Sequence, residues 1–350
     1  GVWGSYAALG LYGRVSMVLS RSGLKYEMSQ HGDRIMGSSN LLYRLVEDNL
    51  KTAPESVVFI EGDQKISFQQ FDRLCRQKES WLRSQGIGSG DTVAMWLVNS
   101  TEWLAFFFAL ARIGAVLAPL NTRYKSHEIG YMIEKSQPRL LIMQGQFRKI
   151  DFIDIFSQVD NSELRSLEKI AFLGADETLP GSLKGIAITS TDVPGTESSS
   201  ERVPDESNVC ILFSTSGTTS GPKLVMQTQE NLFRHGHYCA SSYGMTLPDS
   251  ALLSVLPFCG AFGLNAVLAA MAAGCPTIIM AAFDGREAAS LIQDYGISHV
   301  YGSDELYRKL IDAAEGVKPF PSARLFGFGA FTSSFNDYAL AAWERGIPLC

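Results

Sequence analysis

Residues 214–223 read S-T-S-G-T-T-S-G-P-K and combine the side-chain types that bind phosphate. Two glycines, Gly217 and Gly221, allow backbone N–H groups to approach an anion closely. Lys223 adds a positive charge at the end of the stretch. Hydroxyl groups that can donate to phosphate oxygens come from Thr215, Ser216, Thr218, Thr219 and Ser220. We therefore predict a phosphate-binding loop, with a flexible surface loop of small polar residues as the alternative.

This loop departs from the Walker A pattern, which ends in G-K-[ST]. Pro222 stands in place of the second glycine of that pattern, and Leu224 stands where a hydroxyl would hold magnesium. The apolar run 209–213 before the loop is predicted to be a buried strand, and a helix is predicted from about Asn231. The loop is therefore expected to leave the end of a strand.

Residues 215–223 resemble the signature loop of the adenylate-forming superfamily, which includes acyl-CoA synthetases, adenylation domains of peptide synthetases and beetle luciferases. That family usually has glycine at the position of Ser220, and often at the position of Leu224. The resemblance implies ATP-dependent conversion of a carboxylic acid to an acyl-AMP, followed by transfer of the acyl group to coenzyme A or another acceptor. It implies ATP, Mg²⁺ and coenzyme A as cofactors, a small carboxylic acid as substrate, and Lys223 and Thr218 as catalytic residues.

A second loop, 257–263, follows the predicted buried strand 251–256 and reads P-F-C-G-A-F-G. Loops at the carboxyl ends of strands bind ligands in α/β proteins, and small apolar residues suit the hydrocarbon part of an acid. We therefore expect Phe258, Gly260 and Phe262 to contact the substrate, with Gly302 on a second wall. An ordinary glycine-rich connection is the alternative. The superfamily usually has a histidine near Gly260, so its absence here leaves room for a larger acid or alters gating.

Two further segments carry the resemblance. Residues 329–331, G-A-F, follow a predicted strand and resemble the G-A-P segment that contacts adenine in the superfamily, which implies nucleotide contacts for Gly329, Ala330 and Phe331. Phe331 stands where proline is usual, and its ring could stack on the base or fill the core. Residues 119–124, P-L-N-T-R-Y, resemble a phrase common in acyl-CoA synthetases. There we expect Arg123 to be an ion-paired surface or interdomain residue rather than a catalyst.

Strand and helix patterns alternate along most of the chain, which predicts an α/β fold with parallel β-α-β units. The resemblance implies two stacked αβ subdomains with largely parallel sheets flanked by helices, without the C-terminal lid domain. We place the first subdomain at 40–200 and the second at 201–350, because residues 189–200 are rich in Gly, Ser, Thr and Pro. The first predicted helix is capped by Ser39 or Asn40.

Residues 1–39 form an extension whose structure we leave open: the alternatives are an amphipathic helix, a signal peptide, and a start at Met36 with an extension before it. No apolar run is long enough for a membrane span. A net charge of −6 gives no indication of a nucleic-acid partner. Six scattered cysteines favour a reducing, cytoplasmic compartment over a disulfide framework. His235 and His237 face different sides of a helix, so a shared metal is not expected, and the oligomeric state is left open.

Several elements of the superfamily do not occur within residues 1–350, including the aromatic-G-x-T-E segment and the C-terminal lysine. We therefore expect this chain to bind nucleotide weakly and to catalyse little by itself. Two alternatives stay open: a nucleotide- or acid-binding module without turnover, and an adenylation domain or acyl-AMP ligase with a different acceptor. Phe258 and Phe262 favour an aliphatic or aromatic acid over an amino acid.

Overall fold

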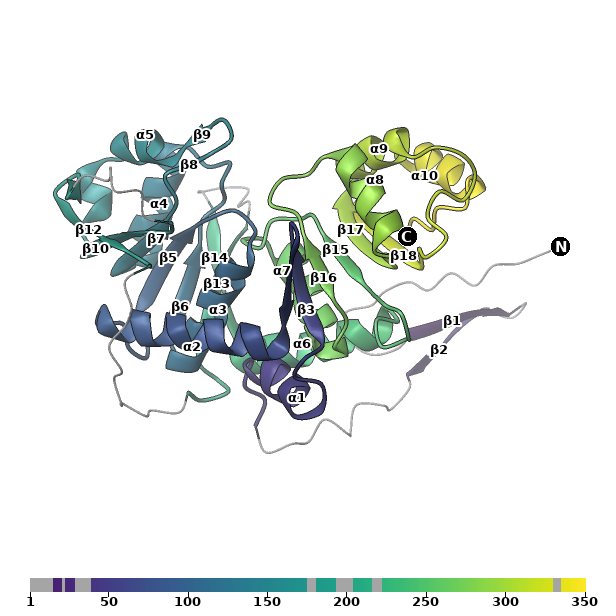
Figure 1. Ribbon diagram of the computed structural model, residues 1–350, viewed down its shortest axis with the longest axis horizontal. Helices are drawn as coiled ribbons and strands as arrows, with labels where there is room; N and C mark the ends of the chain where they lie inside the picture. Colours follow the sequence, from purple (N-terminus) through teal and green to yellow (C-terminus); the bar gives the residue numbers. More distant parts are fainter. Residues whose placement is uncertain are drawn as a thin grey trace.

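The computed structural model describes residues 15–20, 23–28, 39–174, 181–192, 204–215, 222–329 and 335–350. It is an α/β structure with two large, mostly parallel sheets, as the sequence predicts. Figure 1 shows one sheet in each half of the molecule, with helices packed between them and on their outer sides.

The larger sheet has the strand order β11-β12-β10-β7-β5-β6-β13-β14. Its inner strands run parallel, and antiparallel pairs occur only at the two edges, β11 with β12 and β13 with β14. The strands are β5 Thr92–Trp96, β6 Val116–Pro119, β7 Leu140–Met143, β10 Lys169–Phe172, β11 Ser182–Leu183, β12 Ile186–Ser190, β13 Val209–Thr215 and β14 Lys223–Thr228.

The second sheet has the order β18-β17-β15-β16-β3-β4, and it too is parallel except at one edge. Its strands are β3 Val57–Glu61, β4 Gln64–Ser67, β15 Leu252–Ser254, β16 Thr277–Ile279, β17 His299–Ser303 and β18 Leu325–Gly329. A separate short hairpin joins β8 Gln146–Phe147 to β9 Ile150–Asp151.

Helices cover both faces of each sheet. They are α1 Arg44–Thr52, α2 Phe68–Ser84, α3 Thr101–Ile113, α4 Ser126–Ser136, α5 Phe152–Ser157, α6 Gln229–Ser242, α7 Ala261–Ala273, α8 Gly285–Asp294, α9 Asp304–Ala313 and α10 Phe335–Glu344. Residues 161–164 form a short 3-10 helix. Gly236 lets α6 approach α7 closely, because a Cβ atom there would lie 3.2 Å from the carbonyl oxygen of Leu268. None of the described helices is long and apolar enough to cross a membrane.

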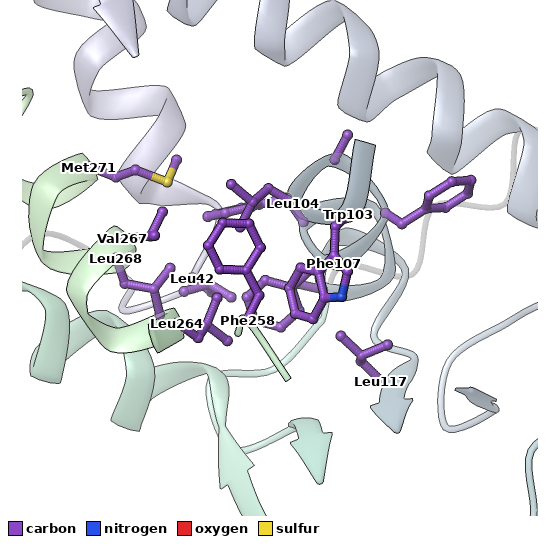
Figure 2. Packing of buried hydrophobic residues seen from close by; sticks show 14 of the residues in the cluster. Leu42, Trp103, Leu104, Phe107, Leu117, Phe258, Leu264, Val267, Leu268 and Met271 are labelled. Carbon is purple, nitrogen blue, oxygen red and sulfur yellow. The ribbon is translucent and has the colours of Figure 1, made fainter. Parts of the chain in front are cut away.

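The largest core cluster lies between the two sheets and holds them together. Helix α3 is buried along almost its whole length, and α7 is apolar on nearly every side, so both pack as interior helices. Figure 2 shows side chains from both helices meeting, with Phe258 beside Trp103 and Leu264. The ring centroids of Trp103 and Phe258 are 5.4 Å apart.

The order of strands differs from a simple division of the chain at residue 200. Strands β3 and β4 precede that point but belong to the second sheet, and β13 and β14 follow it but belong to the first. The predicted boundary near residue 200 therefore does not separate the two sheets. Each sheet needs strands from both parts of the chain because pairing is decided by packing between distant segments.

Two local predictions near the N-terminus are also corrected. The backbone of Val15–Ser20 and Gly23–Met28 forms an antiparallel hairpin, β1 with β2, rather than the amphipathic helix that was one of the alternatives. The first helix begins at Arg44 rather than near Leu41, and its N-cap Tyr43 provides no side-chain bond. Asn40 instead donates from its backbone N and its Nδ2 to the carboxylate of Glu206, at 2.8 and 3.1 Å, which ties this segment to the start of β13.

Candidate functional site

A cavity of about 320 Å³ lies where the carboxyl ends of strands from both sheets meet. The first sheet contributes the ends of β6 and β13, and the second contributes the ends of β15 and β17. The lining residues are Asn121, Tyr124, Ser214, Leu256, Pro257, Cys259, Gly260, Phe262, Gly263, Gly302 and Ser303. This is the edge at which open α/β sheets bind ligands. The volume is at the small end of the range for ligand pockets.

The first sheet supplies a polar wall. The hydroxyls of Tyr124 and Ser214 are 2.9 Å apart and hydrogen-bonded, which joins the segment after β6 to the end of β13. Asn121 lies two residues after β6 and accepts a hydrogen bond from the backbone N of Arg123 at 3.0 Å. In the sequence, segment 119–124 was notable only for its resemblance to acyl-CoA synthetases. The structure places two of its side chains, Asn121 and Tyr124, at the cavity.

The hydroxyl-rich loop begins one residue beyond this wall. Strands β13 and β14 are antiparallel, and the pair Thr215–Lys223 closes the hairpin that brackets the loop. The Thr215 hydroxyl donates to the Lys223 carbonyl at 3.5 Å, and the Tyr131 hydroxyl donates to the Pro222 carbonyl at 3.0 Å. Both Thr215 and Lys223 are exposed. The other predicted loop residues, Ser216, Gly217, Thr218, Thr219, Ser220 and Gly221, lie outside the described residues.

The second sheet supplies an apolar wall, which includes two of the three residues predicted in 257–263. Gly260 and Phe262 line the cavity, and Phe262 keeps 45% of its surface exposed. Gly260 is also the N-cap of α7, so the positive end of that helix is directed at the cavity. Gly263 lets the first turn of α7 pass under the loop, since a Cβ atom there would lie 2.4 Å from the Pro257 carbonyl oxygen.

Phe258 was predicted to contact substrate, and the structure corrects this. Its side chain is fully buried against Trp103 in the core between the sheets and does not line the cavity (Figure 2). A large aromatic side chain gains most by leaving water completely, and the adjacent α3 offers an apolar surface for it. Phe258 therefore anchors its loop by packing into the core on the side away from the cavity.

Asn99 holds the same loop and was not identified as a site residue from the sequence. Its Nδ2 donates to the carbonyl of Leu256 at 2.8 Å, and its Oδ1 accepts from the backbone N of Phe258 at 2.9 Å. Asn99 follows β5 of the first sheet and is 7% exposed, so this pair of bonds crosses from one sheet to the other. Only its position after a strand could have drawn attention to it.

The third side of the cavity is formed by the end of β17. Gly302 lines the cavity as predicted, together with Ser303, the N-cap of α9. Ser303 pairs in register with Gly329 at the end of β18. The segment resembling the adenine-contacting motif therefore starts beside the cavity. Ala330 and Phe331 lie outside the described residues.

Cys259 lines the cavity as a neutral thiol. Burial raises the pKa of this thiol to about 12, although the positive charge of Arg123 acts in the opposite direction. Such a thiol is a poor nucleophile at neutral pH. Arg123 itself is exposed, and the ion pairs found among the described residues do not include it.

The described residues hold no group of three or more His, Cys, Asp or Glu side chains that could bind a metal ion. His235 lies 3.3 Å from the sulfur of Cys239, and His237 packs edge-on against Phe233. All six cysteines are free.

Comparison with known proteins agrees with the geometry. Residues 46–336 match the family described as AMP-binding enzyme. A Bacillus subtilis protein named "Putative acyl-CoA synthetase YngI" is 33% identical over 261 residues, which cover 69% of this chain and 47% of that protein. The chain spans about half the length of the curated relatives it matches.

Solved structures share the fold. The N-terminal domain of FACL13 from Mycobacterium tuberculosis superposes with a TM-score of 0.67 at 22% identity, covering 88% of this chain and 74% of that one. o-Succinylbenzoate CoA synthetase from Bacillus subtilis, solved with its acyl-adenylate intermediate, gives 0.68 at 19% identity, covering 87% and 72%. The family match covers most of the chain, including both sheets and the cavity between them. This chain belongs to the AMP-binding enzyme family.

Proposed function

We propose that the protein activates a carboxylic acid with ATP to an acyl-adenylate and that the acyl group then passes to coenzyme A as a thioester. In the first step a carboxylate oxygen forms a bond to the α-phosphorus of ATP. The bond from that phosphorus to the bridging oxygen breaks, and pyrophosphate leaves with the electron pair. Coenzyme A then replaces AMP at the acyl carbon, and the thiol proton is released.

The observation that carries this proposal is the position of Ser214. It lines the cavity, and the hydroxyl-rich loop starts at the next residue, Thr215. A triphosphate held by that loop would therefore lie beside an acid in the cavity. We assign the phosphates to Thr215, Ser216, Gly217, Thr218, Thr219, Ser220, Gly221 and Lys223, and we assign the adenine side to Gly329, Ala330 and Phe331.

The reaction requires two anions to approach each other, so groups around the site must offset their negative charge. Lys223 and the loop donors would neutralise the charge that develops on pyrophosphate, and a donor of this kind is typically worth about 3 kcal/mol of barrier. The amino end of α7 at Gly260 favours a negative charge in the cavity. Mg²⁺ would enter with ATP, and we assign it no protein ligand.

The cavity wall fits the remainder of the acid. Gly260, Phe262 and Gly302 present small or apolar surfaces, and among the described residues no acidic side chain lines the cavity to pair with an α-amino group. This favours an aliphatic or aromatic acid over an amino acid. Among relatives, one Escherichia coli protein, 28% identical, is named crotonobetaine/carnitine–CoA ligase.

The test is to incubate the full-length protein with ATP, Mg²⁺ and a panel of aliphatic, aromatic and amino acids, and to detect acyl-AMP by mass spectrometry. Calorimetric titration with ATP runs in parallel. Acyl-AMP from at least one aliphatic or aromatic acid is the expected result. ATP binding without acyl-AMP from any acid would instead identify a binding module, and formation only with amino acids would contradict the substrate class.

A further inference from the structure

The turn that follows β6 holds the side-chain amide of Asn121 in one orientation. The backbone carbonyl of Asn121 accepts hydrogen bonds from the backbone N of Tyr124 at 3.0 Å and from Nε1 of Trp96 at 3.2 Å. Its side-chain Oδ1 accepts from the backbone N of Arg123 at 3.0 Å. Because Trp96 is fully buried, this turn is anchored to the interior of the eight-stranded sheet.

These bonds decide which polar groups Asn121 can offer a ligand. A backbone N–H group can only donate, so the amide atom next to the N–H of Arg123 is the oxygen and the other amide atom is the NH₂ nitrogen. Both oxygens of Asn121 are therefore engaged within the chain. Among the described residues, no acceptor bonds to its Nδ2. Asn121 is half-buried and lines the cavity, so the side-chain group that it can offer there is a donor.

The rest of the polar wall adds a second donor and no charge. The hydroxyls of Tyr124 and Ser214 are bonded to each other at 2.9 Å. That bond uses one of their two hydrogens, so one hydroxyl hydrogen remains for a ligand. In the part of the chain that the structure describes, the lining residues include no Asp, Glu, Lys or Arg. A wall with surplus donors and no competing carboxylate is complementary to an anionic oxygen of a ligand.

We propose that Nδ2 of Asn121 donates a hydrogen bond to an anionic oxygen at the reacting centre, which belongs to the α-phosphate of ATP or to the carboxylate of the acid. The inference rests on the proposed function, which brings both groups to this cavity. It adds a binding residue outside the hydroxyl-rich loop. Because the turn fixes the amide before a ligand arrives, the donor needs no reorganisation when the two anions meet.

The test removes the donor and keeps the turn. In the full-length protein, Asn121→Asp retains an oxygen for the N–H of Arg123 and the same side-chain shape, but it replaces the NH₂ group with a carboxylate oxygen that repels an anion. Asn121→Ser also keeps an acceptor for the turn and removes the amide donor without adding charge. Asn161→Asp adds the same charge at an exposed position outside the cavity and is the matched control.

Each variant is titrated by calorimetry with adenosine, AMP, ATP, hexanoate and benzoate. A hydrogen bond to a charged group is worth about ten- to hundredfold in affinity, so Asn121→Ser should weaken binding of the contacted anion about tenfold and Asn121→Asp at least about thirtyfold. A loss for AMP and ATP identifies the phosphate, and a loss for the acids identifies the carboxylate. Adenosine carries no anionic oxygen, so its affinity should stay within about twofold of the wild type. Asn161→Asp should bind every ligand as the wild type does.

Further readouts separate a lost donor from a disturbed wall. The Tm of both Asn121 variants should stay close to that of the wild type, and if Asn121→Asp unfolds, Asn121→Ser decides. Unchanged affinity for every anion, an equal loss for adenosine and AMP, or no binding of any of these ligands by the wild type would overturn the inference. Acyl-AMP formation at the wild-type rate in Asn121→Asp would overturn it and leave the proposed function intact. Anion binding that depends on Asn121, without acyl-AMP from any acid, would retain it and contradict the proposed function.

Discussion

The two walls of the cavity offer a ligand different chemistry. The wall from the eight-stranded sheet consists of polar side chains and leads directly into the hydroxyl-rich loop. The wall from the six-stranded sheet consists of glycines, apolar side chains and the start of α7. The polar wall is therefore suited to binding charged groups of a ligand, and the apolar wall is suited to contacting its hydrocarbon part. Asn99 joins them, since it follows a strand of the first sheet and holds the loop of the second.

The largest effect is expected from breaking that junction. Asn99→Leu keeps the size of the side chain but leaves the Leu256 carbonyl and the Phe258 N–H without their partner, which should lower the free energy of unfolding by about 2–4 kcal/mol. The apolar wall should also shift, so acyl-AMP formation should fall more than tenfold. Urea unfolding and the acyl-AMP assay measure the two effects. Asn161→Ala, at an exposed position, is the control, and equal behaviour of the two variants would remove Asn99 from the account.

A smaller effect is expected within the polar wall. Tyr124→Phe removes the bond between the Tyr124 and Ser214 hydroxyls but keeps the ring, so stability should change by only about 1 kcal/mol. Because Ser214 lies at the base of the hydroxyl-rich loop that we propose to bind the phosphates, ATP affinity should decrease about three- to tenfold, whereas affinity for the acid should change less. Calorimetric titration with each ligand separates the two. If acid affinity decreased more than ATP affinity, this result would contradict the assignment of ATP to the polar wall and of the acid to the apolar wall.

The smallest effect is expected at Cys259, which lies on the apolar wall but takes no part in the chemistry. Cys259→Ala should leave acyl-AMP formation within about twofold of the wild type. Because burial raises the thiol pKa to about 12, the thiolate fraction should rise roughly tenfold with each pH unit up to that value. Alkylation of Cys259 by iodoacetamide, followed by peptide mass spectrometry, should therefore accelerate well beyond pH 9. A rate that levels off near pH 9 would show an ordinary, accessible thiol.

The sequence was informative about elements and loops but less so about their partners. Continuous apolar runs predicted the strand before the hydroxyl-rich loop and the strand before residues 257–263, and Gly260 and Gly302 were predicted as wall residues from their positions at the ends of strands. The hairpin β3–β4 comes early in the chain but joins the six-stranded sheet, whose other strands are β15 to β18. The hairpin β13–β14 comes later but joins the eight-stranded sheet, whose other strands precede it in the chain. Such pairings depend on contacts between distant segments, which local patterns do not contain.

Side-chain direction around the start of α7 was the second difficulty. Phe258 lies in the loop before α7 and Phe262 in the first turn of the helix, and the first fills the core whereas the second faces the cavity. Because the helix begins between them, no single periodicity relates the directions of the two side chains. Asn99 was missed for a related reason, since its role depends on backbone groups that are more than 150 residues away in the chain.

The most direct test of the central claim is ATP–pyrophosphate exchange in variants of the hydroxyl-rich loop made in the full-length protein. Lys223→Ala and Thr218→Ala should each lower acid-dependent exchange more than tenfold, because each removes a group assigned to the phosphates of ATP. Lys65→Ala, which removes an exposed lysine from β4 at the edge of the other sheet, is the matched control and should exchange at the wild-type rate. Wild-type exchange in both loop variants would contradict the account.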